Sequence, residues 1–157
     1  MATPRNRAHD FFATHVVPAV ADWEKAPTDM RLAMNVAVAL NQMVDHYWHA
    51  FASDTTRVLG AKDVKTFRAE LAKRESGWSL VRDVAEAHKH VKLTRPVRAI
   101  TSAGQAINTV TGYGEAGFGT GPFGGAESVV VTHDDGTKTH LSWVVKQSMS
   151  MWERMLA

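Results

Sequence analysis

The chain has 157 residues, of which 45% are hydrophobic and 22% charged, and it contains no cysteine. This length and composition are typical of one globular domain, and they exclude a fibrous or wholly disordered chain. The lack of cysteine excludes disulfides and thiolate metal sites, and we expect a cytoplasmic location. Because no stretch approaches about 18 consecutive apolar residues, the sequence predicts no membrane span.

The net charge of +2 conceals an uneven distribution of charge along the chain. Residues 61–98 carry ten basic and five acidic side chains, whereas both flanks have a small acidic excess. In this region Lys89, Lys92, Arg95 and Arg98 follow one another with no acid between them. Such a run can attract a phosphate backbone or an acidic partner, or it can be a solvated helix end whose cations suit the helix dipole.

Four helices are predicted in the first 95 residues. Apolar side chains recur at helical spacing over residues 7–24, 29–52, 62–75 and 78–93. Pro18 has no amide hydrogen, so the first helix must begin or kink there. Thr28 and Asp29 are expected to cap the second helix, and Pro96 is expected to end the fourth near Arg95. Short links between successive helices are typical of a bundle.

The pattern changes after Pro96. Residues 97–102 predict a short strand, and residues 104–125, which hold eight of the eleven glycines, are interpreted as a loop-rich insertion. Asp135 and Gly136 lie between two strand-like runs, which predicts a hairpin with a tight primed turn. A closing helix over residues 141–156, capped by Ser142, is expected to pack on the sheet.

The predicted fold class is therefore α+β, mainly α, in a single domain over residues 1–157. An N-terminal four-helix bundle over residues 1–95 is followed, over residues 96–157, by a short strand, a glycine-rich loop, a β-hairpin and a C-terminal helix. Gly112 to Gly117 also match the letters of a dinucleotide-binding motif, but a glycine-rich stretch with no helical pattern follows them, where such a site needs a helix. We interpret that segment as a flexible loop able to cover a pocket or an edge.

Two pairs of side chains suggest a metal site. His46 and His49 share one edge of the second predicted helix, and Glu86 and His90 are four residues apart in the fourth. Facing helices can supply ligands in this way, so a metal is one hypothesis, although no particular cofactor is indicated. Hydrogen bonding of the histidines at the rim of the bundle is the alternative.

The segment from Arg82 to His88 carries the most specific motif, an arginine and a histidine separated by five residues with Asp83 after the arginine. With the four-helix order, which covers about three fifths of the chain, it resembles the HEPN superfamily of ribonucleases and non-catalytic binding modules. The resemblance implies that His88 relays a proton of a ribose 2′-hydroxyl and that Arg82 stabilises phosphate charge. It also implies a site assembled across a dimer, and in that case Lys89, Lys92 and Arg95 would hold phosphate.

Helical geometry complicates this interpretation. Six residues turn an ideal helix by about 600°, which leaves Arg82 and His88 about 120° apart around the axis. A bend or a second chain would be needed to join them, so we expect a homo-oligomer. Alternatively, Arg82 and Glu86 form an ordinary exposed pair and His88 points inward. The sequence thus leaves a non-enzymatic interaction or regulatory domain and an RNA-cleaving or RNA-binding protein as competing hypotheses, with RNA or a protein as partner.

Overall fold

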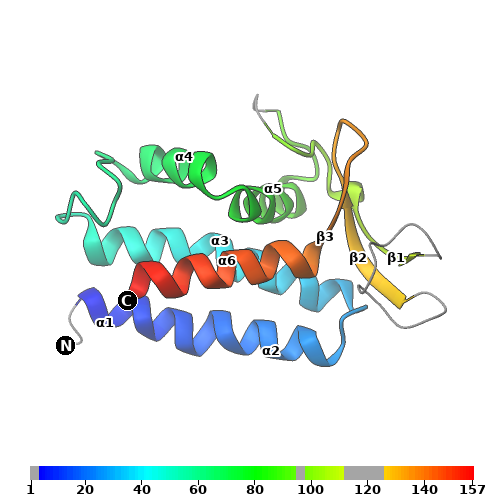
Figure 1. The fold of residues 1–157 in the computed structure, drawn as a ribbon, viewed down its shortest axis with the longest axis horizontal. Helices are drawn as coiled ribbons and strands as arrows, with labels where there is room; N and C mark the ends of the chain where they lie inside the picture. The colour runs from blue at the N-terminus through cyan, green and yellow to red at the C-terminus, as the bar shows by residue number, and fades with distance from the viewer. Residues whose placement is uncertain (1–3, 95–97, 112–125) are drawn as a thin grey trace.

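The structure is a computed structural model that describes residues 4–94, 98–111 and 126–157 (Figure 1). Its elements are α1 (Pro4–Phe11), a π-helix η1 (Phe12–Val16), α2 (Val17–Lys25), α3 (Met30–Phe51), α4 (Val64–Arg74), α5 (Ser76–His90), a short 3₁₀ turn η2 (Ala103–Gln105), β1 (Ala106–Thr111), β2 (Ala126–Thr132), β3 (Lys138–His140) and α6 (Leu141–Leu156). The predicted α+β class, mainly α, is confirmed.

The first predicted helix is one rod made of α1, η1 and α2. Pro18 lies in the first turn of α2, directly after the π-helical segment. A proline lacks the amide hydrogen that would continue the α-helical ladder, and a π-helical turn is a known way to accommodate a local break in that ladder. The rod therefore continues past the proline, through a local change of helical type.

Helix α3 has the bounds that its sequence pattern predicts. The Asp29 carboxylate accepts hydrogen bonds from the amides of Arg31, at 2.8 Å, and Leu32, at 3.2 Å, which satisfies two of the donors left free at a helix start. The apolar face includes Leu40 and Tyr47, both buried in the core. This helix is the centre of the molecule, in contact with α1, α2, α4, α5 and α6.

Helix α5 ends at His90, earlier than Pro96 suggests. Val91 takes a φ of 65°, a left-handed conformation that a β-branched side chain rarely adopts, and its amide donates to the Ala87 carbonyl at 2.7 Å. Lys92 then forms an isolated bridge with Ser102. The strand expected over residues 97–102 is therefore wrong, at least over the described residues 98–102, which contribute only that bridge.

The sheet is antiparallel, with the order β1-β2-β3. Strand β1 lies inside residues 104–125, which we interpreted as loop, and pairs with β2 from Ala106 opposite Val131 onward. The hairpin between β2 and β3 is confirmed, but its turn is not the expected primed type, because Asp135 lacks a positive φ. Instead the His133 amide donates to the Thr137 carbonyl at 2.7 Å, and Gly136 alone turns left-handed, with a φ of 86°.

Helix α6 joins the bundle as well as closing the sheet. It contacts β2 and β3, as expected, but it packs most extensively on α5 and also contacts α3 (Figure 1). The Trp152 and Tyr47 rings lie 5.6 Å apart between α6 and α3. Ser142 is exposed and does not cap the helix, because His140 occupies the N-cap position.

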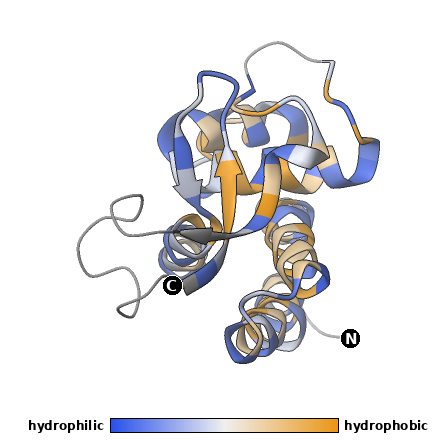
Figure 2. Cartoon of the chain, turned by 90° about the vertical axis from the view of Figure 1, so that its right-hand side faces the viewer, coloured by the Kyte–Doolittle hydropathy of each residue, from blue (hydrophilic) through white to orange (hydrophobic). Residues whose placement is uncertain are grey.

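Helices and sheet share one hydrophobic core. The buried cluster includes side chains from the bundle, from β2 and from α6, with Val131 and Trp152 both fully buried. Figure 2 looks onto the end of the molecule that carries the sheet, with the helices behind it. Among the described residues, no helix combines the length and hydropathy needed to cross a membrane.

A close approach between α5 and α6 predicts the effect of one substitution. A Cβ added to Gly77 would lie 2.9 Å from Cβ of Gln147 on α6, closer than van der Waals contact allows. Gly77→Ala should therefore lower the free energy of unfolding by about 1–3 kcal/mol in urea titration, even though alanine favours helix. Gly104→Ala is the control, because a Cβ there meets no heavy atom within 4 Å. Equal stability of the two variants would contradict this packing.

Candidate functional site

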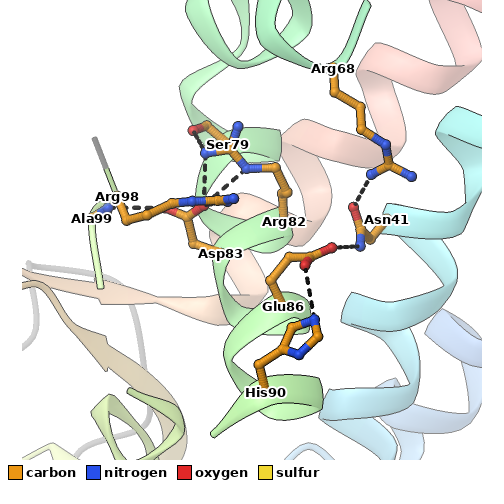
Figure 3. A network of polar contacts seen from close by, with 9 residues as sticks. All are labelled: Asn41, Arg68, Ser79, Arg82, Asp83, Glu86, His90, Arg98 and Ala99. Atoms are coloured by element: carbon orange, nitrogen blue, oxygen red, sulfur yellow. Dashed lines mark hydrogen bonds and ion pairs between the residues drawn. The ribbon is translucent and has the colours of Figure 1, made fainter. Parts of the chain in front are cut away.

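Asp83 is a buried carboxylate at the centre of an ion-pair cluster on α5 (Figure 3). Its side chain is 1% exposed. Nε and Nη2 of Arg82 donate to Oδ1 of Asp83 at 2.9 and 2.7 Å, and Nη1 of Arg98 donates to the same oxygen at 2.6 Å. The amide of Ala99 donates to Oδ2 at 2.9 Å. The buried negative charge is therefore compensated by two guanidinium groups and a backbone hydrogen bond.

This ion-pair cluster determines which groups the Arg82 guanidinium can contact. Its side chain is only 14% exposed, its Nη2 also lies 3.4 Å from Oγ of Ser79, and its guanidinium carbon stands 5.9 Å from the centre of the Trp78 ring. The expected Arg82–Glu86 pair is not formed, since the nearer and more buried carboxylate of Asp83 takes the guanidinium. Asp83 therefore fastens α5 to the chain at residues 98–99, and Arg82 helps to compensate its buried charge.

Glu86 belongs to a second polar network, which links α3, α4 and α5 (Figure 3). Nδ2 of Asn41 donates to Oε1 of Glu86 at 3.2 Å, and Nη1 of Arg68 donates to Oδ1 of Asn41 at 2.9 Å. Nη2 of Arg68 also donates to Asp45 at 2.8 Å, and His90 lies 3.7 Å from Glu86. Asn41 and Arg68 were not among the predicted site residues, although a polar Asn41 directly after the apolar position of Leu40 was a signal.

His88 is exposed, so the expectation that it points inward is wrong. The buried face of α5 is made by Val84 and Ala87 with their neighbours, and His88 lies beside Ala87 at a cavity of about 310 Å³. None of the hydrogen bonds or ion pairs found among the described residues includes His88. Its imidazole and the Arg82 guanidinium therefore have different surroundings: one is free at the surface and the other is bonded inside the fold.

The cavity beside His88 lies between the start of α3, the second half of α5 and the turn before β1. Seven of its lining residues are apolar and three are polar: Met30, Met34, Val84, Ala87, Ile100, Ala103 and Ala106, with Arg31, Asn35 and His88. No carboxylate is among them. An apolar hollow edged by basic and amide groups can hold an aliphatic side chain, with negative charge placed beside it.

The predicted run of cations near the end of α5 is only partly available. Lys89, His90 and Lys92 are exposed beyond the cavity. Arg98 is instead buried against Asp83, so it cannot reach an external partner, and Arg95 falls outside the described residues. What remains is a small basic surface formed by Lys89, Lys92 and His88.

The histidines of α3 do not assemble a metal site with α5. The His46 ring stacks on Phe11, with centroids 3.7 Å apart and planes 10° apart, and Phe11 also stacks on His15 of η1 at 4.8 Å. His49 is exposed. Across residues 4–94, 98–111 and 126–157, no group of three or more metal-binding side chains was found. The structure thus brings His46 onto an aromatic ring of α1, a contact that the sequence did not predict.

The environment of His46 predicts a pH dependence of stability. Burial lowers the pKa of His46 from its ordinary value of 6.5; the Asp45 charge opposes this, and His15 and His49 reinforce it. The unfolded chain therefore takes up a proton at His46 more readily than the folded one, so stability is lost as pH falls below about 6.5.

The test compares wild type with His46→Gln in urea at about pH 7.5 and pH 5.5. Wild type should lose stability relative to the variant on acidification, because only wild type carries the titrating group. His49→Gln is the control and should keep most of the wild-type loss, since His49 is exposed and is the smallest of the influences on the pKa of His46. A relative gain for wild type at low pH would show that the folded state favours protonated His46.

The glycine motif of residues 112–117 falls outside the described residues. Comparison of the chain with family models, with curated proteins and with solved structures found no match.

Proposed function

We propose that the chain is a non-enzymatic interaction domain of the cytoplasm that binds an acidic protein segment at the C-terminal end of α5. One observation carries this proposal: the Arg82 guanidinium is held inside the fold by Asp83, while His88 stands free beside an apolar cavity. The two residues of the motif therefore serve different purposes. Arg82 stabilises the fold, and His88 lies at the proposed binding surface.

The chemistry of the surface favours a protein partner over RNA. The cavity volume of about 310 Å³ lies within the range of ligand pockets and exceeds that of one aliphatic side chain. Its lining includes no phenylalanine, tyrosine or tryptophan on which a base could stack, whereas RNA recognition commonly uses such rings. Positive charge comes from exposed Lys89 and Lys92 at the end of α5, and from Arg31, which is partly neutralised by Asp29 at 3.5 Å. A protein segment with one large apolar residue and acidic neighbours would fill the cavity and would also pair with the positive charge beside it.

The experiment is a selection from a random peptide library displayed on phage, with the whole chain as bait. Enriched peptides should carry a leucine-like anchor beside two or more acidic residues. Binding of the best peptide should weaken at least about tenfold in Ala103→Leu, which fills the cavity, and severalfold in Lys89→Gln/Lys92→Gln. Lys25→Gln is the control, because Lys25 is also exposed but lies at the end of α2. Peptides that bind Ala103→Leu as tightly as wild type would refute the site.

The HEPN-like ribonuclease stays a second candidate because the His88 imidazole is exposed and free of described polar contacts. In that case a homodimer would have to supply the arginine or a substitute for it, since Arg82 is engaged within its own chain. A monomer in sedimentation velocity at working concentration would rule out this candidate, whereas the interaction domain can act as a monomer or as a dimer.

A further inference from the structure

A polar furrow crosses the surface near the start of α5, where α5 meets α6. Its volume is about 390 Å³, and its lining includes Arg74, Glu75, Trp143, Lys146 and Arg154. Gly77 and His88 are separated by eleven residues of α5, or about 16 Å along the helix. The furrow is therefore a separate surface from the cavity beside His88.

Trp143 is the first unusual feature of this furrow. It is 62% exposed, whereas Trp152, nine residues later on the same helix, is fully buried. No aromatic stacking or cation–π contact found among the described residues involves the Trp143 ring. A large flat ring is thus presented to the outside at one end of a hollow.

The charges of the furrow are the second feature. Arg74, Lys146 and Arg154 supply three cations, and Glu75 is the one carboxylate among the lining side chains. Nη2 of Arg154 lies 2.9 Å from Oε1 of Glu75, so this pair is partly neutralised. In the described part of the chain, Arg74 and Lys146 form no ion pair. The furrow therefore keeps a positive excess that no ion pair of these two cations neutralises.

The positions along α6 arrange these groups in a row. Trp143, Lys146 and Arg154 are spaced by three and eight residues and line one hollow, so they extend over about 16 Å of helix. Lys146 also borders the hollow between α2 and α6, whose lining includes the acids Glu24 and Glu153. These acids mark the limit of the positive surface.

We propose that this furrow binds single-stranded nucleic acid, with a base stacked on Trp143 and phosphates held by Arg74, Lys146 and Arg154. Aromatic rings that accept unpaired bases, next to cations that follow the backbone, are the common basis of sequence-tolerant single-strand binding. A duplex keeps its bases stacked on each other and cannot offer one to the ring. An acidic peptide would use the cations but would gain little from the aromatic face.

The test measures fluorescence anisotropy of a labelled oligouridylate of about twelve nucleotides, titrated with the whole chain. Trp143→Leu should weaken binding about tenfold, whereas Trp143→Phe should keep most of it, because phenylalanine preserves a stacking surface. Arg74→Gln and Lys146→Gln should each reduce the slope of log affinity against log salt by about 0.7, the value for one lost phosphate contact. Lys25→Gln is the charge-matched control and should leave the slope unchanged.

One substitution should act in the opposite direction. Glu75→Gln removes the carboxylate that holds Arg154, so it should tighten binding severalfold. A duplex of the same length and a polyglutamate peptide should both compete poorly.

The proposal is overturned if Trp143→Leu binds like wild type, or if the duplex or the polyglutamate competes as well as the single strand. Those results would identify the furrow as a general polyanion surface. Failure of this test leaves the peptide selection at the His88 cavity unaffected, since none of these substitutions touches that cavity.

Discussion

Asp83→Ala should lower the free energy of unfolding by about 3–5 kcal/mol, the largest loss that we expect from a single polar substitution. The change leaves Arg82 and Arg98, which are 14% and 12% exposed, as buried cations without their carboxylate. It also leaves the Ala99 amide without its acceptor. Urea titration followed by circular dichroism measures the loss.

Asp45→Ala is the matched control for this prediction. Nη2 of Arg68 lies 2.8 Å from the Asp45 carboxylate, nearly the same as the 2.7 Å between Arg82 and Asp83, but Asp45 is 51% exposed. Water can solvate the groups that remain, so the expected loss is below about 1 kcal/mol. If both variants lost the same stability, burial would not be the origin of the Asp83 effect.

Trp78→Ala should cost about 3–5 kcal/mol as well, because it empties a large space in the core. Trp78 is fully buried, and its Nε1 donates to the Leu40 carbonyl at 3.5 Å, so the side chain joins α5 to α3. Trp143→Ala removes the same side chain from an exposed position and should change stability by no more than about 0.5 kcal/mol.

Thermal unfolding of the two tryptophan variants measures this contrast directly. A large loss in Trp143→Ala would mean that the exposed ring has a structural role. That result would also weaken the assignment of Trp143 to nucleic-acid binding. Retention of full stability by Trp78→Ala would contradict the described packing of α5 on α3.

The helices could be predicted because their information is local. In α3 the apolar positions recur over six turns, and Asp29 lies directly before the first of them, so periodicity and capping agree. The sequence also predicts a break in the helix at Pro18, but not the π-helical turn that the structure has there. Whether a proline starts a helix, kinks it or follows a π-helical turn depends on how the rod packs on α3.

Strand β1 was not predicted because of the sequence that surrounds it. Its sequence, Ala-Ile-Asn-Thr-Val-Thr, contains β-branched residues but lies within a glycine-rich region, which favours a loop. Pairing with the strongly apolar β2 decides its conformation, and this pairing joins residues that are distant in sequence. A long-range partner thus overrides the local composition.

In the candidate site too, residues distant in sequence determine where side chains lie. The spacing of Arg82 and Glu86 predicts a helical pair, but Arg98, which follows Asp83 by fifteen residues, completes a buried cluster that draws Arg82 away. His88 was expected inside because apolar residues precede it, but the side chains of η2 and β1 leave a cavity beside it. Neither arrangement can be derived from the residues of α5 alone.

The central claim is that Arg82 and His88 do not act together as a catalytic pair. The direct measurement is a time course of a labelled single-stranded RNA incubated with purified wild type and with His88→Ala, alongside their melting temperatures. We expect both proteins to leave the RNA intact, because the Arg82 guanidinium is engaged by Asp83 within its own chain. We also expect them to melt at the same temperature, because His88 is exposed and free of described polar contacts. Cleavage by wild type that disappears in His88→Ala, with melting unchanged, would contradict it.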